Sequence, residues 1–214
     1  MERDGSAMVR LQDVTAVVLC GGKSRRMGLD KSLLSMNGVS FIQTIVSQLD
    51  SFREVVLATG SSSRYHIPGT RNICDEYIDC GPLGALYSAF VQCESEFAFT
   101  VPCDLPLFTA DLAHSIVACM DERSDVVVPI TSDGRFHPLC ACYRASIAPV
   151  LKQELDKGRF KVMKALETLR LKNICIEDDS VLTNINTPED YFDLKNYIRR
   201  KEDDFKEQSN EHKA

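Results

Sequence analysis

Short apolar stretches with the composition of β-strands alternate with segments of helical periodicity along most of this chain. The strand signals lie at residues 14–20, 55–59, 72–74, 98–101, 126–130, 139–143 and 174–176. Segments with helical spacing of apolar residues lie between and after them, at 40–49, 83–92, 110–121, 146–156 and 188–200. Alternation of this kind is typical of βαβ units, whose right-handed crossovers build a mostly parallel sheet. The pattern therefore predicts an α/β fold with a Rossmann-like, mostly parallel central sheet flanked by helices.

The length and composition fit one such domain. The chain has 214 residues, of which 44% are hydrophobic and 26% charged, and a domain of this size buries roughly 70% of the surface of its unfolded chain. We expect a polar, flexible leader at residues 1–12, a single domain at 13–200 and a polar tail at 201–214 that frays. No apolar run approaches the ~20 residues of a membrane span, so we expect no membrane partner.

The net charge limits the classes of partner that the protein could bind, and the cysteines indicate its cellular compartment. A net charge of −6 argues against a nucleic-acid partner, and the basic residues between positions 23 and 31 would form a local positive site for a small anionic ligand. The nine cysteines include no C-x-x-C pair and no zinc-type spacing. An odd number of cysteines without a secretory signal predicts the reducing cytoplasm.

The segment 17–31 carries the strongest functional signal. An apolar run ends in Gly21 and Gly22, and basic residues, a further glycine and Lys31 follow. Glycine leaves no Cβ in the way of a ligand, and consecutive backbone N–H groups can form an anion-binding concavity. Arg26 and Lys31 would add full positive charge. Because parallel sheets bind ligands beyond the carboxyl ends of their strands, the segment predicts a loop that grips a triphosphate.

Two other phosphate-binding patterns are excluded here. A Walker loop would place its first glycine on Val17, inside the predicted strand, and no G-x-G follows that strand as a dinucleotide fingerprint requires. The remaining alternative is a glycine-rich turn with solvated basic residues. Three glycines together with Arg26 and Lys31 behind a buried strand favour the triphosphate loop over that alternative.

Asp104 follows another apolar strand and is bracketed by two prolines. An aspartate at the tip of a parallel strand is well placed to bind Mg²⁺, which prefers hard oxygen ligands and needs few protein carboxylates. The alternative is an aspartate that caps a turn or a helix. Thr109 is a better cap for the helix that follows, so we predict that Asp104 holds the metal.

A Gly81-Pro82 pair opens the helical segment after residue 80. Proline is favoured in the first turn of a helix, and a helix N-terminus attracts anions or polar ligand edges. Asp75, a few residues earlier, could accept hydrogen bonds from a base or a ribose, or could simply cap a turn. The residues alone leave these two roles open.

Three further motifs have a structural and a functional interpretation. Thr187, Pro188 and Asp190 have the spacing of a capped helix start, which leaves Asn184 and Asn186 without a role. His137 before a proline is more often structural than catalytic. The basic residues within segment 158–163, Arg159 and Lys161, could hold a phosphate or simply be solvated.

Five of these motifs, between residues 17 and 190, resemble those of nucleotidyltransferases related to molybdenum cofactor guanylyltransferase and follow the family's order along the chain. Residues 19–31 meet every fixed position of the pattern L-x-G-G-x-x-x-R-M-G-x-D-K, and residues 102–106 match P-C-D-x-P. The other matches are G-P-L at 81–83, H-P at 137–138 and N-x-N-T-P-E-D at 184–190. Two positions depart from the family. Either Ala85 replaces the final glycine of G-P-L-x-G or Gly84 matches it one position early, and Ala58 stands where guanine-using relatives often have asparagine.

The resemblance implies a Rossmann-like nucleotidyltransferase fold and an enzyme that transfers GMP from GTP to the molybdenum-pterin cofactor and releases pyrophosphate. It implies that Arg26, Lys31 and Asp104 are catalytic and that Asp104 binds Mg²⁺. It further implies that nucleotide and acceptor contact Leu19, Cys20, Gly21, Gly22, Lys31, Asp75, Gly81, Asp104, Asn184 and Asn186. Proteins that deliver or receive the cofactor are further expected partners.

Other activities remain open from the sequence. A relative within the class would transfer CMP to the same cofactor, and more distant relatives nucleotidylate sugar phosphates. A catalytically idle nucleotide-binding regulatory domain belongs to a different class. It would tolerate loss of Arg26, Lys31 or Asp104, whereas all three are present.

Overall fold

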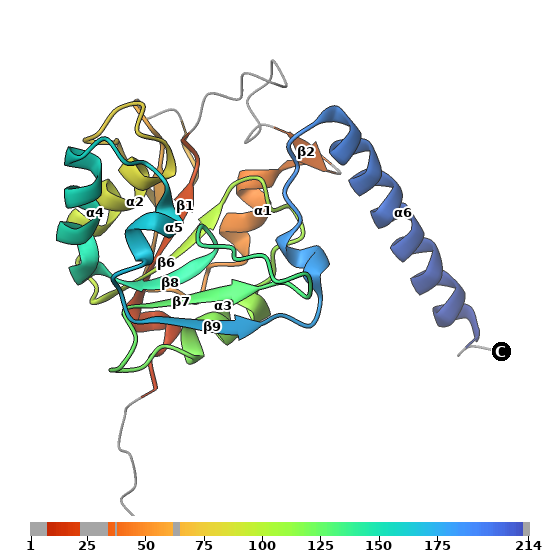
Figure 1. Cartoon of the computed structure of the whole chain (residues 1–214). Helices are drawn as coiled ribbons and strands as arrows, with labels where there is room; N and C mark the ends of the chain where they lie inside the picture. Colours follow the sequence, from red (N-terminus) through yellow and green to blue (C-terminus); the bar gives the residue numbers. More distant parts are fainter. Residues whose placement is uncertain (1–7, 22–33, 37, 62–64, 212–214) are drawn as a thin grey trace, which may run out of the picture.

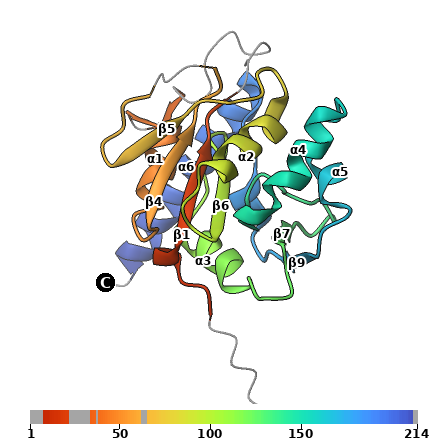
Figure 2. The ribbon, with the colours of Figure 1, turned by 90° about the vertical axis from the view of Figure 1, so that its left-hand side faces the viewer.

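The computed structural model describes residues 8–21, 34–36, 38–61 and 65–211, and the side chains of 202–211 are not described. Seven of the described strands form one sheet in the order β5-β4-β1-β6-β8-β7-β9. Figure 2 shows these strands succeeding one another across the molecule. They are β1 (Val14–Leu19), β4 (Glu54–Ala58), β5 (Thr70–Ile73), β6 (Phe97–Pro102), β7 (Val126–Ile130), β8 (Ala141–Arg144) and β9 (Leu171–Cys175).

Within this sheet β8 is the antiparallel strand, and the pairings that do not involve it are parallel. The central strand β1 pairs with β4 from Thr15 opposite Glu54 and with β6 from Val14 opposite Phe97. The carboxyl ends of β5, β4, β1 and β6 therefore meet at one edge of the sheet. The predicted α/β fold with a mostly parallel central sheet is confirmed.

Helices cover both faces of the sheet, as Figure 1 shows. The helices are α1 (Phe41–Ser47), α2 (Gly81–Val91), α3 (Ala110–Ala118), α4 (Ala148–Asp156), α5 (Val162–Leu166) and α6 (Pro188–Glu211), with single 3₁₀ turns at Leu11–Asp13, Ala145–Ile147 and Asp179–Leu182. Alternate residues of β1 serve the two layers, and all six are buried. Val14, Ala16 and Val18 pack with α1 and α3. Val17 and Leu19 pack with α2 and α4.

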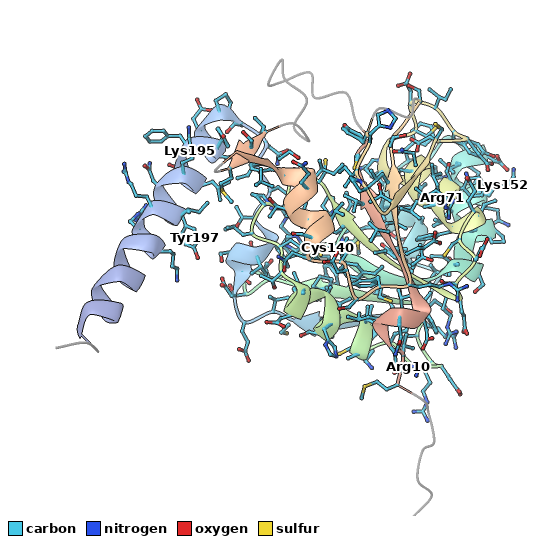
Figure 3. The ribbon with its side chains drawn as sticks, turned by 180° about the vertical axis from the view of Figure 1, so that it is seen from behind. Arg10, Arg71, Cys140, Lys152, Lys195 and Tyr197 are labelled. Carbon is cyan, nitrogen blue, oxygen red and sulfur yellow. The ribbon has the colours of Figure 1, made fainter. Side chains whose placement is uncertain are left out.

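A third, smaller apolar cluster joins the start of α6 to the rest of the domain. Phe41, Ile185 and Leu194 are its buried members. Leu34 packs against them, as does Met36 of the short hairpin formed by β2 (Ser35–Met36) and β3 (Val39–Ser40). Beyond this cluster α6 projects away from the sheet (Figure 1). Figure 3 places Lys195 and Tyr197 of α6 on the side of the molecule opposite Lys152 of α4.

The structure corrects several predicted boundaries. The hairpin β2–β3 and the five-residue α5 were not predicted, and β9 begins three residues before the predicted 174. The last helix does not end at residue 200 but continues to Glu211, through most of the expected tail. Among the described residues, no helix is both long and apolar enough to cross a membrane.

Candidate active site

The chain that leaves β1 passes very close to the loop after β4. Cys20 N donates to the carbonyl of Ala58 over 2.8 Å, which continues the β1–β4 pairing past the end of the strand. A Cβ on Gly21 would lie 3.2 Å from Gly60 N, and Gly60 itself has a φ of +73°. Glycine at both positions therefore allows two loops to touch at the carboxyl edge of the sheet.

The structure places three of the predicted site residues at this point. Leu19 and Cys20 are buried, and Cys20 Sγ donates to the carbonyl of Val18. Their side chains therefore belong to the core, and a ligand could use only their backbone. Gly21 is exposed at the end of the strand. Gly22, Arg26 and Lys31, which complete the predicted triphosphate loop, lie outside the described residues.

Asp104 lies at the same edge, after the neighbouring strand β6. Cys103 N donates to the carbonyl of Leu19 over 3.2 Å, so the turn that carries Asp104 is bound to the end of β1. Thr109, and not Asp104, caps α3 by accepting a hydrogen bond from Leu112 N. The half-buried Asp104 thus follows the strand without serving as the cap of the next helix.

The C-terminal segment brings Asn184 to Asp104. Asn184 Nδ2 donates to Asp104 Oδ1 over 2.7 Å, and Ile185 N donates to the Asp104 carbonyl over 2.9 Å. Ile185 is buried in the third apolar cluster, which fixes this contact to the domain. Asn186 is exposed, and its backbone N donates to Asp190 Oδ2. The structure therefore joins Asn184 to Asp104 directly and places Asn186 one step further along the same segment.

The helix start after these asparagines is as predicted. Asp190 N donates to Thr187 Oγ1 over 3.1 Å, and Thr187 N donates to Asp190 Oδ2 over 2.9 Å. This reciprocal pair is a capping box with aspartate in place of the usual glutamate. The capping role and the placement of Asn184 at the site hold together.

Asp75 and Gly81 lie on the loop after β5, beside the loop that carries Gly60. Asp75 N donates to the carbonyl of Gly60 over 2.7 Å, so Gly60 contacts both Gly21 and Asp75. Gly81 has a φ of +65° and opens α2. Cys80, the cap residue, gives α2 no side-chain hydrogen bond, which leaves the first-turn N–H groups to other acceptors.

The carboxyl group of Asp75 has an unusual environment. Its Oδ1 is buried and has no hydrogen-bond partner among the described residues. Burial raises the pKa of this carboxyl above its ordinary value. An unpaired buried carboxylate oxygen costs free energy in the free protein, and such a cost is expected where a ligand supplies the missing donors.

Asp104 and Asn184 fit the ligand requirements of Mg²⁺. Both side chains offer oxygen atoms, and Mg²⁺ is commonly held by one or two carboxylates together with water and substrate phosphates. In the described part of the chain, no three His, Cys, Asp or Glu side chains form a metal-binding group. A single carboxylate beside one amide suits a metal shared with a phosphate ligand better than a closed protein cage.

His137 and the basic segment make local contacts. His137 Nε2 lies 3.3 Å from Thr131 Oγ1, which also donates to Asp133. Burial, more than the charge of Arg135, lowers the pKa of His137. Arg159 pairs with Glu154, and Lys161 precedes α5. These contacts fit the structural interpretation of His137 and leave Lys161 available to a phosphate.

Sequence reasoning missed Gly60 and left open whether Gly84 or Ala85 takes the place of the glycine after G-P-L. Gly60 follows an apolar strand, as Gly21 does, and this repeated strand-to-glycine order was the available signal. A Cβ on Gly84 would lie 2.7 Å from the carbonyl oxygen of Tyr77. The glycine that the structure requires after G-P-L is therefore Gly84, whereas Ala85 is accommodated as a buried residue of α2.

A central parallel strand that ends in a glycine turn, beside a strand that ends in the candidate metal ligand Asp104, is the arrangement expected of a nucleotide-binding α/β protein. The comparison with known families makes this class specific. The model of the MobA-like NTP transferase domain matches residues 16–171, and the chain belongs to this nucleotidyltransferase family.

Curated relatives agree over nearly their whole length. A probable molybdenum cofactor guanylyltransferase of Flavobacterium johnsoniae is 30% identical over 86% of this chain and 97% of the relative. One of Methanothermobacter thermautotrophicus is 33% identical over 82% of this chain and 96% of the relative. The molybdenum cofactor guanylyltransferase of Campylobacter jejuni is 26% identical over 89% of this chain and all of the relative.

Solved structures share the fold. Molybdopterin-guanine dinucleotide biosynthesis protein A of Archaeoglobus fulgidus superposes with a TM-score of 0.73 at 21% identity, covering 87% of this chain and 99% of that one. The 2-C-methyl-D-erythritol 4-phosphate cytidylyltransferase of Thermus thermophilus reaches a TM-score of 0.65 at 12% identity, with coverages of 86% and 98%. At these identities the likeness concerns the fold alone.

Proposed function

We propose that this protein transfers a GMP group from GTP to the terminal phosphate of the molybdenum-pterin cofactor and releases pyrophosphate. The observation that carries the proposal is the pairing of Asp104 with Asn184 at the end of β6, beside Gly21 at the end of β1. The names of the curated relatives support the choice of donor and acceptor.

The reaction joins two anions, so its main barrier is electrostatic. A phosphate oxygen of the acceptor forms a bond to the α-phosphorus of GTP while the bond to the β-phosphate oxygen breaks, and that electron pair leaves on pyrophosphate. The attacking oxygen is already anionic, and no protein base has to remove a proton. Fixed cations and backbone donors around the phosphates then supply the stabilisation.

Each predicted catalytic residue receives a role in this scheme. Backbone N–H groups of Gly21 and Gly22, together with Arg26, would bind the leaving phosphates, and Lys31 would neutralise the α-phosphate as charge develops. Asp104, oriented by Asn184, would hold Mg²⁺, which supplies positive charge to the phosphates when bound. Because Gly22, Arg26 and Lys31 lie outside the described residues, their roles rest on the family signature.

Asp75 is the candidate for base recognition. Guanine presents two adjacent donors, the ring N1–H and the 2-amino group, and one carboxylate can accept from both. Adenine has an acceptor at N1, so it cannot form the same pair. The half-buried Asp75, whose Oδ1 has no hydrogen-bond partner among the described residues, suits guanine for this reason.

A second candidate is the transfer of CMP to the same acceptor. Ala58 stands where guanine-using relatives often have asparagine, and it is fully buried in β4. It therefore offers no side-chain contact to a base.

The cytoplasmic location stays a prediction, which the presence of all nine cysteines as free thiols supports.

The test has two parts. First, each ribonucleoside triphosphate is added with Mg²⁺ to the wild-type protein and to Asp104→Asn, and the melting temperature is measured. A ligand at ~100 Kd adds about 2.7 kcal/mol of stability, so we expect a selective shift with GTP that weakens in the variant. Second, pyrophosphate release is measured with the pterin acceptor. Selectivity for CTP would favour the second candidate, and binding without release under any acceptor would favour an idle domain.

A further inference from the structure

Tyr77 lies on the loop between β5 and α2, two residues after Asp75, and connects this loop to α4. Its hydroxyl donates to Asp156 Oδ1 over 2.7 Å. Its ring meets the ring of Tyr87 edge-on, with centroids 5.3 Å apart and planes at 85°. The loop is therefore bound both to α2, which carries Tyr87, and to the last residue of α4.

Lys152 completes this arrangement on the outer side of α4, where Figure 3 labels it. Its Nζ pairs with Asp156 Oδ2 over 2.7 Å and lies 5.8 Å from the centre of the Tyr77 ring. The hydrogen bonds from Lys152 and then Tyr77 lower the pKa of Asp156, so this carboxyl is ionised at neutral pH. We call Tyr77, Lys152 and Asp156 together the Tyr77 clip.

The backbone around Tyr77 is held at three further points. Glu76 N donates to Ser88 Oγ over 2.8 Å, and Ser88 Oγ donates to the carbonyl of Gly84 over 2.8 Å. The carbonyl of Tyr77 approaches Gly84 so closely that only glycine fits there. On the other side Asp75 N is bound to Gly60. The clip thus adds a contact with α4 to a short loop that is otherwise held by α2 and Gly60.

We propose that Tyr77 is a positioning residue for base selection, which acts by holding the loop that carries Asp75 through its hydrogen bond to Asp156. This inference rests on the proposed function, in which Asp75 accepts the donors of the base. Recognition by a carboxylate depends on the angle and distance of both oxygens, and a small misplacement of such a group weakens discrimination between similar ligands. The clip lies at the surface, where ion pairs contribute little to stability. We therefore expect the clip to affect the position of Asp75 more than the stability of the protein.

The experiment compares Tyr77→Phe with Tyr87→Phe. The first variant keeps the ring and its contact with Tyr87 but removes the hydroxyl that binds Asp156. The second removes a hydroxyl from the other ring of the same pair and serves as the matched control. Steady-state pyrophosphate release is measured with GTP and with inosine triphosphate, which lacks the 2-amino group. The readout is the ratio of their kcat/KM values, together with the melting temperature of each variant.

For Tyr77→Phe we expect KM for GTP to rise ~5-fold, the magnitude of one lost hydrogen bond, with kcat nearly unchanged. The ratio of GTP to inosine triphosphate should fall because the second substrate uses fewer donors. Asp156→Ala should give the same change, and the double variant no further loss, because both residues act through one bond. Tyr87→Phe should keep the wild-type ratio.

A selective wild type whose ratio is unchanged in Tyr77→Phe would overturn the inference alone and leave the clip a structural contact of α2 with α4. A wild type that turns over all four triphosphates equally would overturn the proposed base recognition and this inference together. If the wild type prefers CTP, GMP transfer is wrong, and the ratio of CTP to GTP in Tyr77→Phe decides the inference.

Discussion

Asn184 donates a hydrogen bond from Nδ2 to Oδ1 of Asp104 over 2.7 Å, across 80 positions of sequence. Ile185 N binds the carbonyl of the same aspartate, so side chain and backbone of Asp104 are both held by the C-terminal segment. The family model that matches residues 16–171 ends before this segment. The candidate metal site is therefore completed by residues outside the matched region.

Replacing Asn184 should impair metal binding more than folding. Groups that orient a metal ligand typically contribute 10–100-fold to metal affinity or activity. For Asn184→Ala we therefore expect the Mg²⁺ concentration at half-maximal activity to rise by ~10-fold or more. A Mg²⁺ titration of pyrophosphate release measures this, with the exposed Asn173→Ala on β9 as the control. An unchanged Mg²⁺ requirement would show that Asn184 does not orient the ligand.

Replacing Lys31 should stop turnover without unfolding the protein. One well-placed donor or cation at the transition state is worth about 2.7–4 kcal/mol of barrier, so Lys31→Ala should slow turnover ~100-fold or more. Lys23→Ala is the matched control, since position 23 is variable in the signature that residues 19–31 match. The measurement is kcat at saturating GTP beside the melting temperature of both variants. Near-normal turnover by Lys31→Ala would refute the assignment.

The sequence predicts the centre of this fold better than its edges. Strands β1 and β6 are buried along their whole length, so they appear as unbroken apolar runs. Strand β9 lies at the edge, with partly exposed residues that include Lys172 and Asn173, and its signal is correspondingly weak. The two-residue strands of the β2–β3 hairpin are too short for any periodicity.

In the candidate site, too, contacts between sequence neighbours could be predicted, whereas contacts between distant segments could not. The helix cap at Thr187 and Asp190 involves neighbours in sequence and was predicted in full. The contact between Asn184 and Asp104 depends on how distant segments pack, and only the family motif pointed to it. The requirement for glycine at position 84 comes from the carbonyl of Tyr77, which no local pattern of α2 reveals.

Gly84→Ala should destabilise the protein, against helix propensity. Within a helix, alanine is favoured over glycine by ~1 kcal/mol. At this position, however, the new Cβ would lie 2.7 Å from a backbone oxygen, and overpacking typically costs about 1–3 kcal/mol. The unfolding midpoint in urea measures the net effect. Ala85→Gly at the next position is the control and should also destabilise; stabilisation by Gly84→Ala would show that the loop yields freely.

The pairing of Asp121 with Lys172 on the outer strand β9 should make the stability of the protein depend on pH in acid. Asp121 accepts hydrogen bonds from Lys172 Nζ and Ser124 Oγ, and these lower its pKa to about 2. Because the unfolded pKa lies near 3.9, the stabilisation is complete above that pH and is lost as the pH falls toward 2. Asp121→Asn should therefore lower the urea midpoint at pH 7 and reduce its decline between pH 4 and pH 2. Glu122→Gln is the control, because its side chain bonds to none of the described residues, and it should leave the acid profile unchanged. An unchanged acid profile in Asp121→Asn would show that the pairing with Lys172 does not form.

Asp75→Asn should stabilise the free protein while it weakens recognition of the base. Burial raises the folded pKa of this carboxyl above its unfolded value, so its ionised form destabilises the fold at neutral pH. That penalty shrinks as the pH falls through the folded pKa toward the unfolded value, because the folded state then takes up the proton more readily. The melting temperature of Asp75→Asn should exceed that of the wild type at pH 7 and approach it near pH 4. Addition of GTP should raise the melting temperature of the variant less than that of the wild type.

Glu76→Gln, in the same loop but exposed, is the control and should change neither the melting temperature nor its shift with GTP. A lower melting temperature of Asp75→Asn at pH 7 would mean that the carboxylate is already paired in the free protein and does not await the donors of a base.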